Sequence, residues 1–375
     1  MNVARPEHRL ALVRDALARE GADWLLVPAS ADFVWLTGAR ARATERLVLF
    51  ALPALGEPFG LVPRLEADAL RAECPWLDLE VWDEHEDPLA RLGSRVRDGL
   101  PLRLGEGFRT GVLLSLAARA ACKPAAPLMA PLRAVKDAEE LARMEVAARN
   151  ADRVMAETAA SLRPGLSERD VARAILSRFD ALGDHDPWAI VASGPNSAFP
   201  HHMSSRRPLE AGEVVLLDLG AFHEGYGSDI TRTFWLGQPP AEFERVYEIV
   251  NQARAAGIAA ARAGAPASSV DAAARGVIEA SGFGAQFIHR TGHGVGLEIH
   301  EPPYLVAGNE VLLASGMTHS VEPGIYLPGR FGVRLEDLVV VEPGGGRRLN
   351  HAPFVPALDT DAPVGAARTP RPDGR

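Results

Sequence analysis

The prediction of the fold starts from HRTGHGVGLEIHE, residues 289–301. This stretch holds three histidines, His289, His293 and His300, and glycines flank the second of them. Imidazole is the commonest neutral metal ligand and the usual acid or base near pH 7. Glycine lets backbone or ligand approach closely because it has no Cβ. Satisfied histidines in a structural loop are the plain alternative, so the prediction of a site depends on ligands elsewhere in the chain.

Each of two apolar segment pairs, expected as β-hairpins at 214–237 and 318–341, carries an acidic residue on both strands. The four acids are Asp218 and Asp229 in the first hairpin and Glu322 and Glu336 in the second. In each hairpin we expect the two acids to face each other, with Cβ atoms roughly 5 Å apart. A single acid of this kind could equally form an ordinary salt bridge or lie at a solvated edge. Four of them in apolar strands need counter-charge, because burying each unpaired charge costs several kcal/mol.

Arg232 and Arg334 offer part of that counter-charge, and two divalent cations would offer more. Carboxylates tolerate close approach when they share metal ions, and His293 would add one nitrogen ligand. One imidazole with four carboxylates suits Mn²⁺, Co²⁺, Fe²⁺ or Zn²⁺, and the oxygen-rich set favours Mn²⁺. The pattern therefore predicts a buried site for two divalent metal ions.

The bulk composition is that of an ordinary globular protein, with 375 residues of which 47% are hydrophobic and 24% charged. This length favours two or three domains. The net charge of -9 gives no footprint for nucleic-acid binding. Two cysteines, Cys74 and Cys122, are too few for a disulfide framework. We find neither a signal peptide nor a run of about 18 apolar residues, so a cytoplasmic protein without a membrane span is expected.

Alternating strands and helices predict a compact α/β domain over residues 1–130. Its first three strands are expected at 24–29, 33–38 and 46–53. The proline-rich segment 124–137 is interpreted as a linker. Beyond it, helices packed on hairpins predict an α+β domain over 131–360. The Pro-, Gly- and Arg-rich tail at 361–375 is expected to be disordered.

Two helices of the second domain begin with a capping-box spacing. Asp137 precedes Glu140 by three residues, which predicts a long helix that ends near Ser161. The same spacing recurs at Ser167 and Asp170, where a second helix is expected to begin. A loop is expected at 191–202, and further helices at about 240–263 and 269–281.

Six motifs resemble, in order and spacing, the signature of the creatinase/prolidase (pita-bread) metallopeptidase family. They are PHH, LLDLGA, SDITRTF, HRTGHGVGLEIHE, VEPGIY and VRLEDLVVV. The motifs span roughly residues 190–341, and the N-terminal domain extends the resemblance over nearly the whole chain. The resemblance implies an α+β fold with a C-terminal pita-bread metallopeptidase domain. A smaller α/β creatinase-like domain would precede it and serve dimerisation and substrate access.

The resemblance also implies a ligand set for two metal ions. Asp218 would bind the first ion, and Asp229 and Glu336 would bridge both. His293 and Glu322 would bind the second. All five residues are present in register in this chain.

Further groups around the metals follow from the same resemblance. Of the two adjacent histidines, the first matches the family pattern, so His201 is preferred to His202. His201 and His300 would orient the substrate and stabilise the tetrahedral intermediate, and Glu322 would take a proton from a water that bridges the metals. Supporting roles are expected for His289, beside the metals, and for Arg334, which would hold the carboxylate ligands.

The resemblance implies a peptidase that cleaves an Xaa-Pro bond through a metal-bridging hydroxide. A prolidase-like Xaa-Pro dipeptidase is the preferred prediction, acting on small peptides with proline in second position. Aminopeptidase P, which releases the N-terminal residue of longer peptides, is the alternative. A metal-free pita-bread module that only binds peptides is a third possibility. Two Mn²⁺ ions per subunit are expected, with Co²⁺ or Zn²⁺ as alternatives, and the family pattern favours a homodimer.

A few polar residues outside these motifs have open interpretations. Solvated surface charge is the preferred explanation for Arg40, Arg42 and Arg46, and binding of a dipeptide's terminal carboxylate by one of them is the alternative. Tyr226 could contribute to the site or simply pack in a turn. His223, His319 and His351 are interpreted as structural or surface residues.

Overall fold

The computed structural model describes residues 6–358. The chain divides into two compact units, Met1–Arg133 and Ala134–Arg375. The tail predicted to be disordered at 361–375 lies outside the described residues. No helix of the described part is long and apolar enough to cross a membrane.

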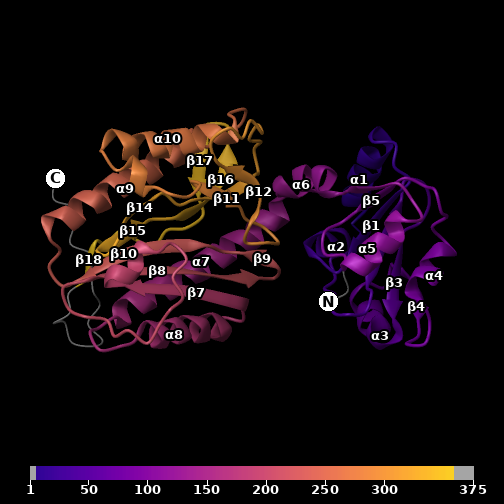
Figure 1. The fold of residues 1–375 in the computed structure, drawn as a ribbon, viewed down its shortest axis with the longest axis horizontal. Coiled ribbons are helices and arrows are strands. Elements are labelled where there is room, and N and C mark those ends of the chain that lie inside the picture. The colour runs from indigo at the N-terminus through magenta and orange to yellow at the C-terminus, as the bar shows by residue number, and fades with distance from the viewer. Residues whose placement is uncertain (1–5, 359–375) are drawn as a thin grey trace. The chain divides into compact units, whose positions relative to one another are not determined.

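A six-stranded sheet in the order β4-β3-β2-β1-β5-β6 forms the centre of the N-terminal unit (Figure 1). The strands are β1 (Trp24–Pro28), β2 (Leu49–Pro53), β3 (Phe59–Pro63), β4 (Asp78–Trp82), β5 (Leu102–Leu104) and β6 (Cys122–Pro124). The helices are α1 (Glu7–Arg19), α2 (Ala31–Thr37), α3 (Arg64–Glu73), α4 (Pro88–Gly93), α5 (Thr110–Ala117) and α6 (Ala126–Ala134). β1 pairs antiparallel with β2 and parallel with β5, and Leu26, Phe59 and Trp82 share one core. The predicted α/β organisation is confirmed.

The segment predicted as a strand at 33–38 is helix α2 instead. The Ser30 side chain caps its first turn by accepting a hydrogen bond from the Phe33 amide. Gly38 follows its end with φ of 74°, a left-handed conformation that glycine adopts readily. Because short apolar runs do not distinguish a strand from a buried helix, the sequence pattern alone was misleading here.

The boundary between the two units, at Arg133 and Ala134, falls inside the segment interpreted as a linker, 124–137, whose residues contribute to strand β6 and form helix α6. Pro131 lies inside this helix. Leu128 and Met129 are buried within the N-terminal unit. We attribute the helix to this burial of apolar surface, which offsets the hydrogen bond that a proline cannot donate.

The first sheet of the C-terminal unit has the order β18-β10-β8-β7, with β9 paired to β8. Its strands are β7 (His185–Ser193), β8 (Val214–His223), β9 (Tyr226–Gly227), β10 (Ile230–Leu236) and β18 (Ala357–Leu358). Helices α7 (Ala138–Ser161) and α8 (Glu168–Ala181) pack on this sheet, and Ile175 and Leu217 share its core. Both helices begin as predicted, with a capping box of Asp137 and Glu140 on α7 and a Ser167 cap on α8.

The second sheet of this unit has the order β12-β11-β13-β16-β17, and a separate ribbon pairs β14 with β15. The strands are β11 (Gly292–Gly294), β12 (Glu301–Leu305), β13 (Thr318–Val321), β14 (Gly324–Leu327), β15 (Phe331–Arg334), β16 (Asp337–Glu342) and β17 (Gly345–Arg348). Helices α9 (Ala241–Ala260) and α10 (Ala267–Ala280) pack on this half. Phe243 of α9 and Ile278 of α10 share a core with Ile325 and Val333 of the ribbon. Short 3₁₀ turns, η1 (Gly194–Ala198) and η2 (Gly284–Gln286), complete the unit.

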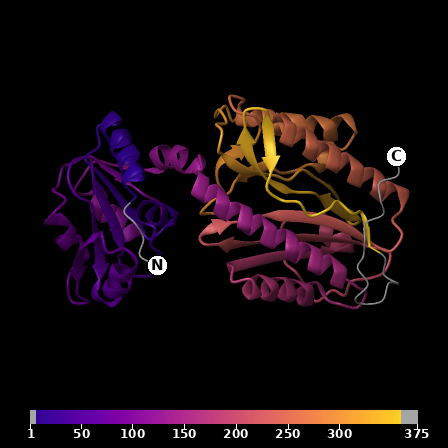
Figure 2. The ribbon, with the colours of Figure 1, turned by 180° about the vertical axis from the view of Figure 1, so that it is seen from behind.

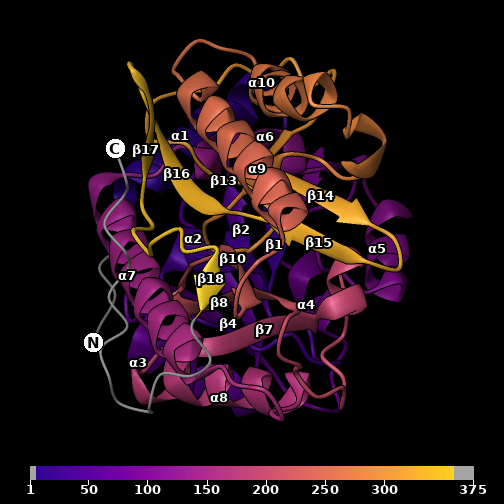
Figure 3. The ribbon, with the colours of Figure 1, turned by 90° about the vertical axis from the view of Figure 1, so that its left-hand side faces the viewer.

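The strands of the C-terminal unit lie between two helix pairs, α9 with α10 on one side and α7 with α8 on the other (Figures 1 and 2). A view from the side shows the ribbon β14-β15 next to α9 (Figure 3). This layering confirms the predicted α+β class. Strand β7 was not predicted, because Asp186 and Pro187 are unfavourable strand residues and a bulge accommodates them. It occupies the start of the loop expected at 191–202.

Candidate metal centre

The first two predicted ligands lie on the neighbouring strands β8 and β10. Asp218 pairs with Thr231 across this ladder, and Asp229 directly precedes Ile230, the first residue of β10. The prediction that the two aspartates oppose each other directly is therefore wrong by two residues. Since side chains alternate with a period of two along a strand, the offset still leaves both carboxylates on the same face of the sheet.

The second predicted hairpin, at 318–341, is divided into two ladders. β13 pairs with β16 up to Val321 and Asp337, while β14 pairs with β15 from Gly324 and Arg334 onward. Pro323 lies in the gap and has no N–H to continue the ladder. Glu322 lies in this gap between β13 and β14, and Glu336 lies in it between β15 and β16.

Because the ladder is broken here, the backbone amides of the two glutamates form hydrogen bonds with other segments of the chain. The Glu336 amide donates to the Thr231 carbonyl at 3.1 Å, which links it to β10. The Glu322 amide donates to the Thr291 carbonyl at 2.8 Å, just before β11. These two hydrogen bonds bring the glutamates, the first sheet and His293 on β11 together.

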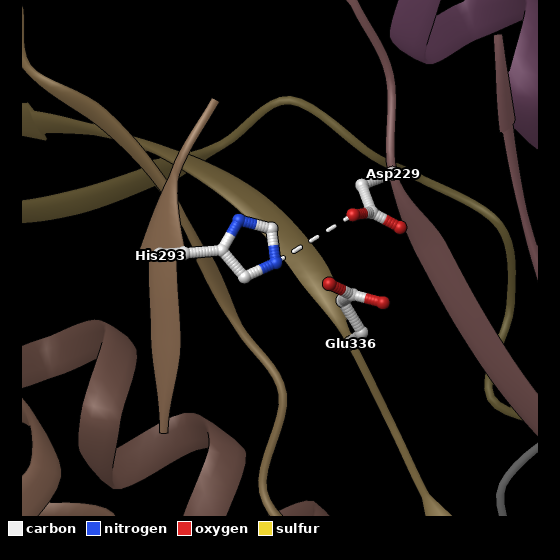
Figure 4. Close-up of side chains that lie close together, drawn as sticks. All are labelled: Asp229, His293 and Glu336. Carbon is white, nitrogen blue, oxygen red and sulfur yellow. Dashed lines mark ion pairs between the residues drawn. The ribbon is translucent and has the colours of Figure 1, made fainter. Parts of the chain in front are cut away.

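The five predicted metal ligands converge on one buried site. They are Asp218, Asp229, His293, Glu322 and Glu336. Ligand atoms of Asp229, His293 and Glu336 all lie within 4.8 Å of one another (Figure 4). His293 Nε2 lies 3.8 Å from Asp229 Oδ2 and 3.2 Å from Glu322 Oε1. Glu322 is partly buried, and the other four are buried.

The electrostatics of this cluster fit divalent cations. Burial, reinforced by the Glu336 charge, raises the pKa of Asp229 well above its usual value. Burial and the Glu322 charge likewise raise the pKa of Glu336, and burial raises that of Asp218 against the opposing charge of Arg334. Asp218 Oδ1 and Asp229 Oδ1 are buried and accept no hydrogen bond from any described residue. Carboxylates crowded in this way, with unpartnered oxygens, suit metal ions that would restore their charge balance.

Glu322 behaves differently from the other carboxylates. Burial opposes its ionisation, but the hydrogen bond and charge of His293 outweigh burial and lower the pKa of Glu322 to about 2. The Ser320 hydroxyl also donates to Glu322 Oε1 at 3.3 Å. The carboxylate is therefore ionised at neutral pH and able to accept a proton.

Arg334 links several groups of the site. It is buried and donates from Nη2 to Asp218 Oδ2 at 2.5 Å and from Nε to Thr231 Oγ1 at 3.2 Å. Thr231 Oγ1 in turn donates to Glu336 Oε2 at 2.7 Å. The predicted role of Arg334 in holding carboxylates agrees with these contacts. Thr231 was missed by sequence reasoning, and the only available signal was its position inside the SDITRTF motif.

Tyr326 is a second residue that sequence reasoning missed. Its hydroxyl accepts a hydrogen bond from Arg334 Nη1 at 3.0 Å and lies 2.9 Å from His289 Nε2. Because arginine can only donate, the single phenolic hydrogen goes to His289 Nε2. His289 Nδ1 then carries the imidazole hydrogen and donates to the Arg290 carbonyl at 2.7 Å. Burial lowers the pKa of His289, in agreement with this neutral form.

The two other predicted histidines lie close to this cluster. The ring centroids of His300 and His293 are 4.1 Å apart. Burial and the charges of His293 and Arg290 lower the pKa of His300 to about 4. His201 is exposed, and its charge contributes to the lowered pKa values of both His289 and His300. His300 therefore packs against the predicted ligand His293, and His201 lies near enough to His289 and His300 to affect their pKa values.

The adjacent histidine, His202, has a different environment. Its Nε2 lies 2.8 Å from Glu168 Oε2, so its side chain is engaged on the side of helix α8. Of the remaining candidates, Tyr226 donates to Glu140 Oε1 at 2.7 Å, and His223 contacts Asp184 at 2.8 Å. These contacts support structural roles for both residues.

The three arginines considered for carboxylate binding lie in the N-terminal unit. Arg46 forms ion pairs with Glu45 and, at 2.6 Å, with Glu84. The Arg40 amide donates to Glu73 at 3.2 Å. A contribution of Arg40, Arg42 or Arg46 to substrate binding remains a prediction.

A buried set of one imidazole and four carboxylates, held between two sheets with further histidines nearby, is the kind of site that metal-dependent hydrolases use. The family model described as Metallopeptidase family M24 matches residues 142–343, and the one described as Creatinase/Prolidase N-terminal domain matches residues 9–135. The chain belongs to metallopeptidase family M24. The resemblance inferred from the six motifs is confirmed.

Known proteins are similar over nearly the full length. A probable dipeptidase, PepE, of Mycobacterium tuberculosis is 40% identical over 354 residues, which cover 92% of this chain and 94% of that protein. The Xaa-Pro dipeptidase of Lactobacillus delbrueckii subsp. lactis is 34% identical over 348 residues, covering 89% and 94%. The crystal structure of a prolidase from Thermococcus sibiricus matches with a TM-score of 0.89 and 34% identity, over 95% of this chain and all of that one.

Proposed function

We propose that this protein is a metal-dependent Xaa-Pro dipeptidase, which hydrolyses the bond between the first residue and proline in a dipeptide. The observation that carries the proposal is the buried five-residue ligand cluster, in which Asp218 Oδ1 and Asp229 Oδ1 have no hydrogen-bond partner among residues 6–358. The names of the similar proteins, which include Xaa-Pro dipeptidase and prolidase, support this substrate class.

Five side chains would hold two divalent cations. Asp218 would bind one ion, His293 and Glu322 the other, and Asp229 and Glu336 would bridge them. Such ions, when bound, lower the pKa of a water between them and polarise a carbonyl oxygen. Mn²⁺ is the ion that we propose, because oxygen atoms dominate the ligand set, with Co²⁺ or Zn²⁺ as alternatives.

The surrounding side chains would provide the remaining steps. Glu322, whose carboxylate is ionised at neutral pH, would take the proton released when water attacks the scissile carbonyl and would pass it to the proline nitrogen as the peptide bond breaks. His300 is neutral at pH 7, since its pKa is about 4, and would donate an N–H hydrogen bond to the peptide. His201, exposed beside it, would donate to the developing oxyanion. Arg334, through Asp218 and Thr231, would keep the carboxylates in place.

We further propose a homodimer that works in the cytoplasm on small peptides with proline in second position. The N-terminal unit would serve dimerisation and substrate access. These expectations rest on the family to which the chain belongs.

The test is hydrolysis of Ala-Pro and Ala-Pro-Ala by chelator-stripped protein, with and without Mn²⁺. We expect cleavage of Ala-Pro alone, restored by Mn²⁺, and no restored cleavage by Asp229→Asn. Equal or better cleavage of Ala-Pro-Ala would make the enzyme an aminopeptidase P. Cleavage of neither peptide with Mn²⁺, Co²⁺ or Zn²⁺ would contradict the proposal and favour a module that only binds peptides.

A further inference from the structure

Glu168, in the first turn of helix α8, is a fully buried carboxylate with both oxygens engaged. Oε1 accepts from the Ser193 amide and hydroxyl, both at 2.8 Å, and from Asn196 Nδ2 at 2.9 Å. Oε2 contacts His202 Nε2 at 2.8 Å and accepts from the Ser205 amide at 2.9 Å and hydroxyl at 2.6 Å. One side chain therefore organises six polar atoms.

These partners enclose a single segment of the chain. Ser193 ends strand β7 and begins the segment, Asn196 lies in the 3₁₀ turn η1, and Ser205 is the last residue of the segment. The Glu168 carboxylate therefore joins the two ends of residues 193–205 through hydrogen bonds to Ser193 and Ser205. His201 lies inside this closed segment.

The opposite side of the segment contacts the candidate metal centre. Arg334 Nη1 donates to the Pro200 carbonyl at 3.3 Å, directly before His201. The Gly332 amide donates to Ser197 Oγ at 2.9 Å. His201 thus lies between one anchor at Arg334 and another at Glu168, which binds the next residue, His202.

We propose that Glu168 is a positioning residue for His201, which fixes the segment 193–205 so that His201 faces the scissile bond. This inference rests on the proposed function, because it assigns His201 to the substrate. The six hydrogen-bonding contacts of the Glu168 carboxylate are all with residues of this segment. Glu168 acts only through the segment that it holds.

The chemistry of the anchor requires a carboxylate. Burial disfavours the charge of Glu168, but the hydrogen bonds from Ser205, Asn196 and His202 outweigh it and lower the pKa to about 2. An ionised carboxylate has only acceptor sites, and here each oxygen meets three donor atoms. Glutamine has the same shape, but its NH₂ group would face three of these donors and could not accept hydrogen bonds from them. Glu168→Gln should therefore release one end of the segment.

The experiment is a double-mutant cycle on Ala-Pro hydrolysis with Mn²⁺, using wild type, Glu168→Gln, His201→Ala and the double variant. We expect Glu168→Gln to lower kcat roughly tenfold through misplacement of His201, with KM and bound metal unchanged. His201→Ala should lower kcat by about 10²-fold. In the His201→Ala background, Glu168→Gln should then change kcat by less than about twofold, because the group that it positions is absent.

A matched control is Asp152→Asn. Asp152 is a partly buried carboxylate that also anchors a segment, accepting from the His351 amide at 2.6 Å and the Ala352 amide at 3.0 Å. The Asp152→Asn variant should have a lower free energy of unfolding and an unchanged kcat. If Glu168→Gln does not fold, Ser205→Ala removes one donor and leaves the buried charge in place, and its loss of kcat should again vanish without His201.

A loss from Glu168→Gln that is equal in both backgrounds, or no loss at all, would overturn the inference. A similar kcat loss in Asp152→Asn would also overturn it, because general destabilisation would then explain both variants. A wild-type protein that does not cleave Ala-Pro would instead contradict the proposed function. The two failures are therefore distinguishable.

Discussion

At the scale of single residues, Arg334 connects four groups around the metal ligands. It donates to Asp218, Thr231, Tyr326 and the Pro200 carbonyl. Only a planar guanidinium can serve these directions together, because its five N–H donors lie in one rigid fork. The compact ammonium of lysine would keep the charge and lose the geometry.

We therefore predict that Arg334→Lys lowers metal affinity or kcat/KM by roughly 10- to 100-fold, as is usual when a partner of metal ligands is lost. Metal titration and Ala-Pro hydrolysis would measure both effects. Arg330→Lys is the matched control, since Arg330 lies four positions earlier and pairs with Glu242 at the surface. Both variants losing activity equally would show that Arg334 has no special role.

At the scale of elements, strand β13 carries a histidine into the core beside the metal centre. His319 is fully buried, and its Nδ1 donates to the Ser320 carbonyl at 2.9 Å. Its Nε2 is buried and has no hydrogen-bond partner in the described part of the chain. Protonation would leave an uncompensated N–H there, and burial accordingly lowers the pKa of His319 to about 4. The prediction of a structural role agrees with this environment.

This burial predicts a pH dependence of stability. Between about pH 6.5 and pH 4, the unfolded state binds a proton at His319 that the folded state does not, so stability falls as pH falls. The contribution lost by pH 5 is on the order of 2 kcal/mol. Urea unfolding of chelator-stripped protein at pH 7.5 and pH 5.0 should show a smaller decrease for His319→Asn than for wild type.

The control for this prediction is His351→Asn, because the side chain of His351 is exposed. It should retain the pH dependence of the wild type. An identical pH dependence in His319→Asn and wild type would show that His319 does not contribute.

At the scale of the whole molecule, all five predicted ligands lie in the unit Ala134–Arg375 and none in Met1–Arg133. Metal that binds only the folded state stabilises it by about 2.7 kcal/mol at a free concentration of 100 Kd. We therefore predict that calorimetry of the chelator-stripped full chain shows two unfolding transitions. Adding Mn²⁺ should raise the midpoint temperature of one transition and leave that of the other unchanged. Asp229→Asn should lose most of the metal-dependent shift. A uniform shift of the entire unfolding profile would mean that the two units unfold together.

The sequence was sufficient to predict a set of candidate ligands and much of the local structure. Three histidines with glycines in one stretch, and acids within apolar strands, are unusual enough to indicate a metal site. The capping residues Asp137 and Ser167 placed the starts of α7 and α8, because capping is a local interaction between neighbouring residues.

Only the tertiary structure decided how the ligands meet. Strand register, which local sequence does not specify, sets three features of the site. They are the offset of Asp229 from Asp218, the gap at Pro323, and the hydrogen bond from the Glu336 amide to Thr231. The contact of Tyr326 with His289 and that of Glu168 with His202 join residues 37 and 34 positions apart, so no periodicity or motif spacing predicts them. Helix α2 forms where the short-range pattern predicted a strand, and helix α6 forms inside the segment interpreted as a linker, because burial of their apolar residues outweighs local propensity.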